Sequence, residues 1–257
     1  MAKMNSEQIS AGKADKHEGW RETLKTVVYA ALIALVIRTV AYEPFNIPSG
    51  SMLPTLLIGD YVFVSKFPYG YSRHSMPLSP PLFSGRINSA PVARGDIAVF
   101  KLPTDNSTDY IKRIIGLPGD HIQVREGVLI INGKVVKRER VDDLVQKHSG
   151  ARYGRVRQYR ETLPNGRSYL TLDLKPRGMA DNTNVYVVPA DHYFAMGDNR
   201  DDSTDSRFLE HVGFVPAENL VGRADMIFFS VDGSARIWEI WKWPSAIRFS
   251  RFFDGFG

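Results

Sequence analysis

The chain contains a single long apolar run, and this run lies near its N-terminus. Residues 26–37 (TVVYAALIALVI) carry no charge, and the apolar character resumes after Arg38 as far as Tyr42. Crossing about 30 Å of hydrocarbon takes about 20 residues, so residues 26–37 alone are too short. The segment 25–45 is long enough if the Arg38 side chain reaches a membrane surface. Any fold of this chain must therefore either bury this apolar run or place it in a membrane.

Three arrangements are compatible with the run. A buried helix of a soluble protein would need an enclosing domain, because the helix is apolar on all sides. A cleaved secretory signal is weakly favoured by residues 39–41 (TVA), which resemble a small-x-small cleavage site. We predict the third arrangement, an uncleaved transmembrane anchor, because cleavage would leave the serine-rich segment 48–56 at a frayed new terminus.

Charges on either side of the run predict its orientation. Five basic residues precede it, whereas Arg38 is the only one between the start of the run and Lys66. The positive-inside tendency therefore places residues 1–25, a polar and mobile tail, in the cytoplasm. The chain from about residue 43 onward would then lie outside the cytoplasmic membrane.

The remainder of the sequence is typical of a mainly β domain. Strand-like runs occur at residues 61–65, 96–100, 110–116, 185–188, 192–196 and 220–229. Asn132-Gly133 and Asn165-Gly166 each separate two strand-like segments and predict hairpins. No long amphipathic helix follows residue 45, and the strands are too short and too punctuated for βαβ units. We therefore predict antiparallel sheets.

Composition excludes several kinds of chemistry. The 257 residues include no cysteine, which removes thiolate nucleophiles, cysteine-bound metals and disulfides. The formal charge of +5 arises in residues 134–177, where 12 Lys and Arg exceed 5 Asp and Glu by 7; the remainder sums to −2, so no nucleic-acid partner is expected. This basic region fits a solvated β surface, with contact to anionic lipid or acidic partners as the alternative. The acidic cluster 198–205 lacks calcium-loop spacing and contains Arg200, which favours Asp–Arg pairing over a metal site.

A serine-rich segment and one lysine carry the candidate chemistry. Residues 48–56 hold Ser49 and Ser51 between two prolines, a stiff bend that suits a nucleophile but is also ordinary turn chemistry. Lys112 lies within an apolar strand-like run, and strand alternation sends Arg113 to the opposite face. Burial would lower the lysine pKa from about 10.4 towards neutrality, as a general base requires. On these residues alone, a structural lysine whose amine reaches the surface stays the alternative.

Four segments, in the right order, resemble the sequence boxes of bacterial type I signal peptidases (leader peptidases). They are residues 43–56 (EPFNIPSGSMLPTL), 94–96 (RGD), 110–120 (YIKRIIGLPGD) and 197–207 (GDNRDDSTDSR). With the preceding anchor they are spread over residues 26–230. The resemblance implies a membrane-bound serine endopeptidase that removes signal peptides from exported preproteins after small residues. It implies an acyl-enzyme mechanism with no cofactor and no metal.

The resemblance also implies a role for individual residues. Ser51 would be the nucleophile, Lys112 its general base, and Ser49 an oxyanion donor beside the Ser51 backbone N–H. Residues implied to support the site are Ser203 (orienting the lysine), Asp205 and Arg207. Residues implied to bind the substrate are Phe45, Ile47, Pro48, Met52, Leu56, Tyr110 and Ile111. Asp202 stands where the family usually has asparagine; because a carboxylate near Lys112 would favour the charged lysine, we expect Asp202 to point away.

The implied fold is a single transmembrane helix followed by an extracytoplasmic antiparallel β-sheet catalytic domain with an inserted β-hairpin subdomain. The expected parts are a cytoplasmic tail (1–25), the anchor (26–42), the catalytic domain (43–125 and 189–235), an inserted cap (126–188) and a C-terminal tail (236–257). The tail mixes aromatic and basic residues, as a membrane-interface segment does, although an arm packed on the domain fits as well. The expected location is the bacterial inner membrane, with a periplasmic catalytic domain. The expected partners are signal peptides and membrane lipid, and the protein is expected to be a monomer.

Two alternatives stay open at this point. The first is a membrane-tethered β domain that binds peptides or lipid without catalysis. The second is the specialised peptidase of conjugative transfer systems, which the absence of cysteine and the complete boxes disfavour. The first alternative can be tested by geometry, because catalysis needs the Lys112 amine within hydrogen-bond reach of Ser51 Oγ.

Overall fold

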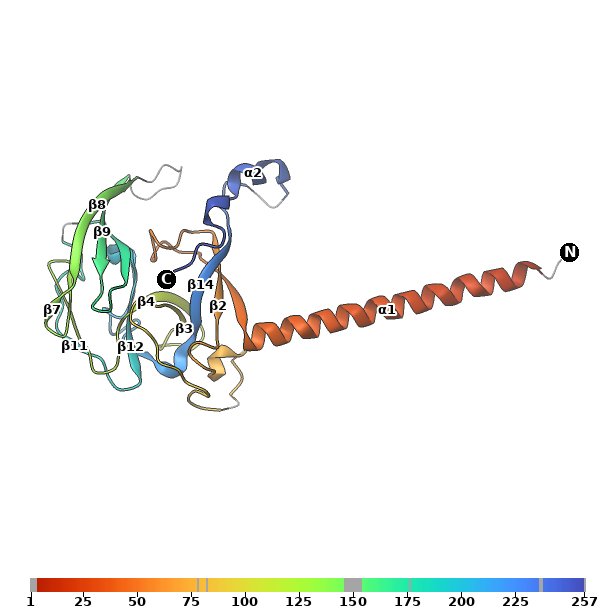
Figure 1. Cartoon of the computed structure of the whole chain (residues 1–257), viewed down its shortest axis with the longest axis horizontal. Helices are drawn as coiled ribbons and strands as arrows, with labels where there is room; N and C mark the ends of the chain where they lie inside the picture. Colours follow the sequence, from red (N-terminus) through yellow and green to blue (C-terminus); the bar gives the residue numbers. More distant parts are fainter. Residues whose placement is uncertain are drawn as a thin grey trace.

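A long N-terminal helix leads into a β domain in this computed structural model (Figure 1). The structure describes residues 4–77, 79–81, 83–145, 154–175, 177–235 and 238–256, with the backbone alone for residues 4–19. Helix α1 spans Met4–Val40, and its apolar part, Trp20–Val40, is 21 residues long and not buried within the fold. This exposure rules out the buried soluble helix and leaves a segment long enough to cross a membrane.

The helix extends further towards the N-terminus than the predicted anchor. Residues 4–25, expected as a mobile tail, have a helical backbone in the structure. This stretch contains no proline and several good helix formers, so nothing in it stops a helix that has already started at the apolar run. The predicted boundaries at residues 25 and 42 stay predictions.

The largest sheet has seven strands in the order β1-β2-β14-β3-β4-β12-β13. Its strands are β1 (Tyr42–Asn46), β2 (Asp60–Ser65), β3 (Ile97–Lys101), β4 (Asp109–Gly116), β12 (His192–Met196), β13 (Val215–Pro216) and β14 (Leu220–Ser230). All of the pairings are antiparallel, as predicted. Phe45 of β1 and Ile111 of β4 pack against the same buried cluster, although three strands separate them in the sheet order. The sheet is therefore curved so that β1 and β4 face each other.

Two smaller sheets are built from the middle of the chain. One has the order β10-β9-β8, and the other has the order β11-β5-β6-β7. Their strands are β5 (His121–Arg125), β6 (Val128–Ile131), β7 (Lys134–Val135), β8 (Lys137–Val145), β9 (Arg155–Thr162), β10 (Ser168–Asp173) and β11 (Tyr186–Val187). Both predicted hairpins are present, with Asn132, Gly133 and Gly166 at positive φ.

Helical structure after α1 is limited to single turns in the described residues. These are η1 (Arg73–Ser75), η2 (Arg200–Asp202), η3 (Ala217–Asn219), η4 (Ile240–Lys242), α2 (Trp243–Ala246) and η5 (Phe249–Arg251). The prediction of a mainly β fold without a long helix after residue 45 is confirmed.

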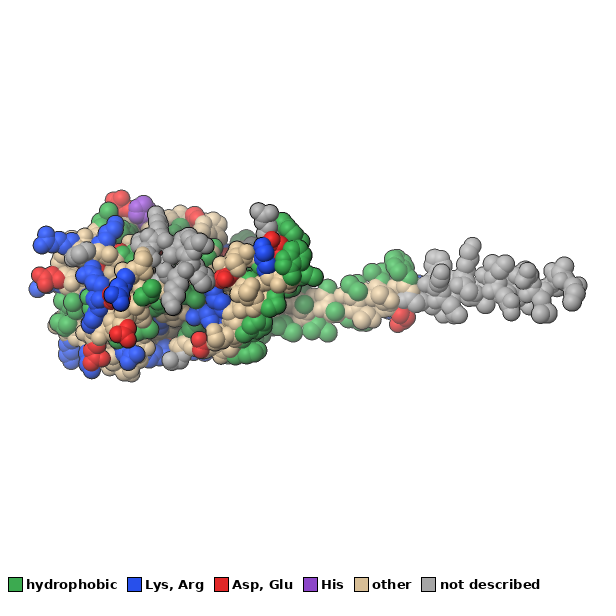
Figure 2. Space-filling view, turned by 90° about the horizontal axis from the view of Figure 1, so that it is seen from above, with side chains coloured by type: hydrophobic (Ala, Val, Ile, Leu, Met, Phe, Trp, Pro, Cys, Tyr) green, Lys and Arg blue, Asp and Glu red, His purple; other side chains and the backbone are tan. Residues whose placement is uncertain are grey.

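The C-terminal segment packs on the domain and also exposes aromatic side chains. Arg248 and Arg251 both reach the buried carboxylate of Asp60, and Arg251 Nη2 also donates to the Thr55 carbonyl at 2.9 Å. Exposed apolar side chains here are Trp238, Ile240, Trp241, Trp243, Phe249 and Phe253. Figure 2 shows hydrophobic side chains gathered at the end of the β domain from which α1 leaves. The segment therefore packs on the domain as an arm and also exposes the aromatic residues that are typical of a membrane-interface segment.

The junction between α1 and the β domain is held by a buried lysine. Lys66 is 0% exposed, and its amine donates to Glu43 Oε2 at 3.0 Å, to the Arg38 carbonyl at 2.8 Å and to the Ser75 carbonyl. The Arg38 guanidinium in turn pairs with Glu43 Oε1 at 2.7 Å. A cation at the C-terminal end of a helix also interacts favourably with the helix dipole. The end of the helix is therefore tied to β1 and to η1.

Candidate active site

The serine-rich segment forms the turn between β1 and β2, and the loop that follows β12 holds it in place. The Asn199 backbone N–H donates to the Ser51 carbonyl at 3.1 Å, and Asn199 Nδ2 donates to the Gly50 carbonyl at 2.9 Å. A Cβ added at Gly197 would lie 2.5 Å from the Ser51 carbonyl oxygen, so only glycine permits this approach. Gly50 itself does not have positive φ; a Cβ there would lie 3.1 Å from the Leu53 side chain. Contacts, more than glycine flexibility, fix the backbone at Ser51.

Lys112 reaches Ser51 from strand β4. The Lys112 amine donates to Ser51 Oγ at 2.7 Å and to the Ile111 carbonyl at 3.0 Å, and the lysine is 4% exposed. Burial, partly opposed by the charges of Asp205 and Asp198, lowers the pKa of Lys112 from 10.5 to about 8. A substantial fraction of Lys112 is therefore neutral at mildly alkaline pH, as a general base requires.

The two serines lie together, whereas no hydrogen bond joins Ser203 to the lysine. The Ser49 and Ser51 hydroxyl oxygens are 3.4 Å apart. The Ser203 side chain is buried, and its hydroxyl makes no hydrogen bond of ordinary geometry within the described part of the chain. It lies close to the Asp205 carboxylate and contributes to lowering the pKa of that group. Any influence of Ser203 on Lys112 therefore has to act through packing or through Asp205.

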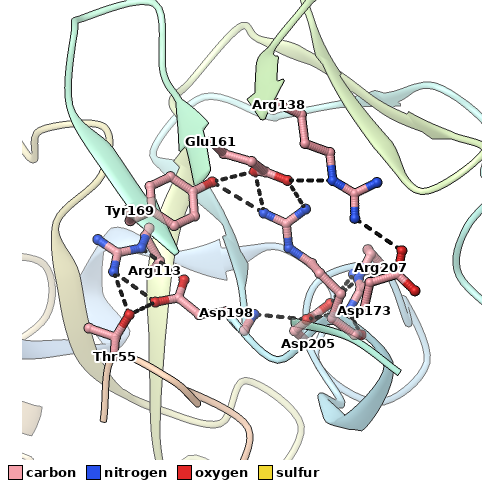
Figure 3. A network of polar contacts seen from close by, with 11 residues as sticks. Thr55, Arg113, Arg138, Glu161, Tyr169, Asp173, Asp198, Asp205 and Arg207 are labelled. Atoms are coloured by element: carbon pink, nitrogen blue, oxygen red, sulfur yellow. Dashed lines mark hydrogen bonds and ion pairs between the residues drawn. The ribbon is translucent and has the colours of Figure 1, made fainter. Parts of the chain in front are cut away.

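Arginine–carboxylate pairs from β4, β9 and the loop after β12 form a network of polar contacts (Figure 3). Arg113, on the face of β4 opposite Lys112, forms two hydrogen bonds with Asp198, at 2.9 and 2.7 Å. Arg207 pairs in the same bidentate way with Asp205, at 2.8 and 2.9 Å. A third pair joins Arg200 to Glu161 of β9, at 2.8 and 2.6 Å. The predicted Asp–Arg pairing is thus present, and the described residues contain no group of three or more His, Asp or Glu placed to hold a metal ion.

Beside Ser51 lies a pocket of about 460 Å³ between β1 and β4. Of the residues implied to bind substrate, Phe45, Ile47, Pro48, Tyr110 and Ile111 line it. The other two, Met52 and Leu56, are buried in the core behind it. Lining residues that the sequence reasoning did not name for this purpose are Asn46, Val99, Asp109, Asp202 and Thr204. Val99 lies on β3 and pairs with Ile111 of β4. The sequence alone does not show which residues of neighbouring strands face each other.

Asp202 does not point away from the site as expected. It lines the pocket, and Asp202 Oδ2 would lie 3.7 Å from a Cβ built on Gly50. The carboxylates that raise the pKa of Lys112 are nevertheless Asp205 and Asp198. The position of Asp202 at the pocket wall is therefore compatible with a lysine of lowered pKa.

The site thus places a serine hydroxyl within hydrogen-bond distance of a buried lysine of lowered pKa, beside a pocket. A family model described as signal peptidase, peptidase S26, matches residues 20–229. The chain belongs to this family, the signal peptidases, and is therefore a serine-type peptidase.

Two relatives of similar sequence agree with this assignment. The chain is 40% identical over 267 residues to the Signal peptidase I of Rickettsia typhi, with 97% of each chain covered. It is 42% identical over 231 residues to the Signal peptidase I of Rickettsia conorii, covering 87% of this chain and 85% of the relative. A crystal structure of a signal peptidase I from Enterococcus faecalis is 26% identical, covering 52% of this chain and 97% of that chain, with a TM-score of 0.30.

Proposed function

We propose that the protein cleaves signal peptides from exported preproteins with Ser51 as nucleophile and Lys112 as general base. The observation that carries this proposal is the 2.7 Å hydrogen bond between the Lys112 amine and Ser51 Oγ. Ser51 Oγ attacks the scissile carbonyl carbon and its proton passes to Lys112 Nζ, which donates it to the departing amine. The resulting ester is hydrolysed by a water that Lys112 deprotonates, and Ser51 regains its proton.

The oxyanion of the tetrahedral intermediate would be stabilised beside Ser51. The Ser49 hydroxyl lies 3.4 Å from Ser51 Oγ, near enough to turn towards an oxygen bonded to the carbon under attack. The Ser51 backbone N–H is the second donor. Loss of one such donor costs about 2.7–4 kcal/mol of transition-state stabilisation in a serine protease.

Strand β4 offers the substrate a backbone edge. Its pairing with β12 covers Arg113, Ile114 and Gly116, whereas residues 109–112 pair only with β3 on the other side. An extended peptide can add there as a strand, with main-chain hydrogen bonds that set its register. Its small residues would then enter the apolar pocket formed by Ile47 and Ile111.

The anchor places this chemistry at a membrane. Family membership and the apolar helix Trp20–Val40 support a membrane-anchored protein. We propose a single-pass protein of the bacterial inner membrane, with a cytoplasmic N-terminus and the β domain on the outer side. The exposed aromatic residues of the C-terminal segment would then rest at the interface.

The test compares the variants Ser51→Ala and Lys112→Met on an exported preprotein, using full-length enzyme in detergent micelles. Both are expected to lose cleavage while unfolding cooperatively on heating. Lys134→Met, which replaces an exposed lysine on β7, serves as the matched control and should cleave normally. Normal processing by either active-site variant would overturn the proposal and favour the non-catalytic binding domain.

A further inference from the structure

A second pocket continues the first one towards the membrane anchor. The two share Phe45 and Asp109 in their walls. Along β1 and the residue after its end, Glu43 lines the second pocket alone, Phe45 lines both, and Ile47 lines the first alone. Alternate residues of a strand lie on one face, so a continuous groove follows this face of β1. The groove leads from Ser51 to Arg38, which lines its far end.

The length of the groove determines which part of a bound peptide reaches the second pocket. Glu43 and Ile47 are four strand residues apart, which corresponds to about 13 Å. Asp109 and Lys112, on the opposite wall, are three residues apart, or about 10 Å. An extended peptide that presents its scissile bond to Ser51 therefore reaches the second pocket with about the fifth and sixth residues on one side of that bond.

The position of α1 indicates which side of the bond this is. Arg38 lies in the last turn of α1, the end at which the apolar helix leaves the membrane in the proposed topology. The apolar segment of a signal peptide precedes the cleaved bond and lies in the same membrane. The residues before the bond therefore run towards Arg38, and the residues after it run away from α1.

The chemistry of the second pocket is polar, with a cation at the membrane end. The Arg38 side chain is 58% exposed, whereas the Glu43 side chain is 13% exposed, and its two oxygens are taken by Arg38 and Lys66. A peptide entering this end meets the guanidinium before it meets the carboxylate. Lys101 and Asp109 form an ion pair at 2.9 Å where the second pocket meets the first.

We propose that the second pocket is a subsite for the polar segment between the apolar core of a signal peptide and its cleavage site. This proposal rests on the proposed function above. Through Arg38 it favours an acidic or amide side chain, and disfavours a basic one, about five or six residues before the cleaved bond. No residue of this subsite takes part in bond breaking; its effect is on the choice of substrate.

The experiment uses full-length enzyme in neutral detergent micelles, first without phospholipid and then with added anionic phospholipid. Three preproteins differ only in the fifth and sixth residues before the cleavage site, which are both Glu, both Gln or both Lys. We expect the wild-type kcat/KM to be about fivefold higher for Glu than for Lys, the effect of one partly exposed ion pair. The Arg38→Gln enzyme should bring this ratio close to one. Arg160→Gln, which removes an exposed arginine of β9 on the three-stranded sheet, should keep the wild-type ratio.

Three results would overturn the subsite. The first is equal kcat/KM for all three substrates with the wild-type enzyme. The second is an equal fall for all three in Arg38→Gln, which would mean that Arg38 acts only by holding Glu43. The third is a charge preference that survives in Arg38→Gln while only stimulation by added anionic phospholipid is lost, which would make the pocket a lipid headgroup site. Ser51→Ala, run on the same substrates, reports separately on the proposed function, because cleavage by that variant would defeat the peptidase mechanism whatever the ratio.

Discussion

Replacing Lys112 by methionine should abolish activity and at the same time make the protein more stable. The amine is buried, and its pKa of about 8 lies below the ordinary 10.5, so the folded state holds the proton less tightly than the unfolded chain does. Below pH 8 the lysine is charged in both states, and burying that charge costs about 3 kcal/mol, at about 1.4 kcal/mol per pH unit. Loss of the hydrogen bond to Ser51 Oγ destabilises the variant by about 1 kcal/mol. The free energy of unfolding of Lys112→Met should therefore exceed that of the wild type by about 2 kcal/mol at pH 7.

Thermal unfolding of the full-length protein in detergent measures this gain. For a chain of this size, about 2 kcal/mol corresponds to a rise in Tm of about 4–8 °C at pH 7. The folded wild type loses its proton above pH 8, so its stability rises between pH 8 and 10.5 and the advantage of Lys112→Met should shrink over that range. Lys134→Met controls for the general effect of removing a lysine. A lower Tm for Lys112→Met at pH 7, or a difference that does not change with pH, would refute the reasoning.

Three further outcomes are expected. The kcat/KM for a preprotein should rise with pH along a single acid limb with a midpoint near pH 8, as Lys112 loses its proton; a flat profile between pH 6 and 9 would contradict the lysine base. Asp198→Asn should lower stability by about 3–5 kcal/mol in a thermal unfolding assay, because it leaves the buried Arg113 charge without its partner; a change below 1 kcal/mol would show that the pair is dispensable. Gly197→Ala should abolish cleavage, because the added carbon would lie 2.5 Å from the Ser51 carbonyl oxygen, and wild-type turnover would show that the loop can shift freely.

The parts of the site that the sequence predicts are those that depend on local pattern. Lys112 could be recognised because a charged residue in an apolar strand needs a partner, and alternation separates it from Arg113. The anchor follows from the charge-free run, and the hairpins follow from Asn-Gly turns at positive φ. The lysine and the hairpins depend on residues within about ten positions of one another, and the anchor depends on a run of about twenty.

The parts that the sequence does not predict depend on distant pairing. In the sheet that brings β1 opposite β4, β14 lies between β2 and β3 and follows both of them by more than 100 residues in the chain. Met52 and Leu56 lie behind the pocket because the turn after Ser51 folds into the core. Strand β8 (KRERVDDLV) lacks apolar alternation; its Arg138 pairs with Asp173 of β10 and lies over the ring of Tyr159, 3.6 Å from the ring centre. Hydropathy does not report such charge pairing between strands.

The buried amine at Lys66 makes the exit of the anchor a stiff joint. It fastens the last turn of α1 to β1, the strand that leads to Ser51, and these contacts oppose rotation of the β domain relative to the helix. Ser51 follows Val40 by eleven residues, and a chain of that length spans about 40 Å at most. The contacts of Lys66 and the short connection from Val40 to Ser51 therefore fix the distance of Ser51 from the end of the anchor. On the proposed function, a signal peptide would have to present its cleavage site at that distance, so the length of its polar segment would affect the rate of cleavage.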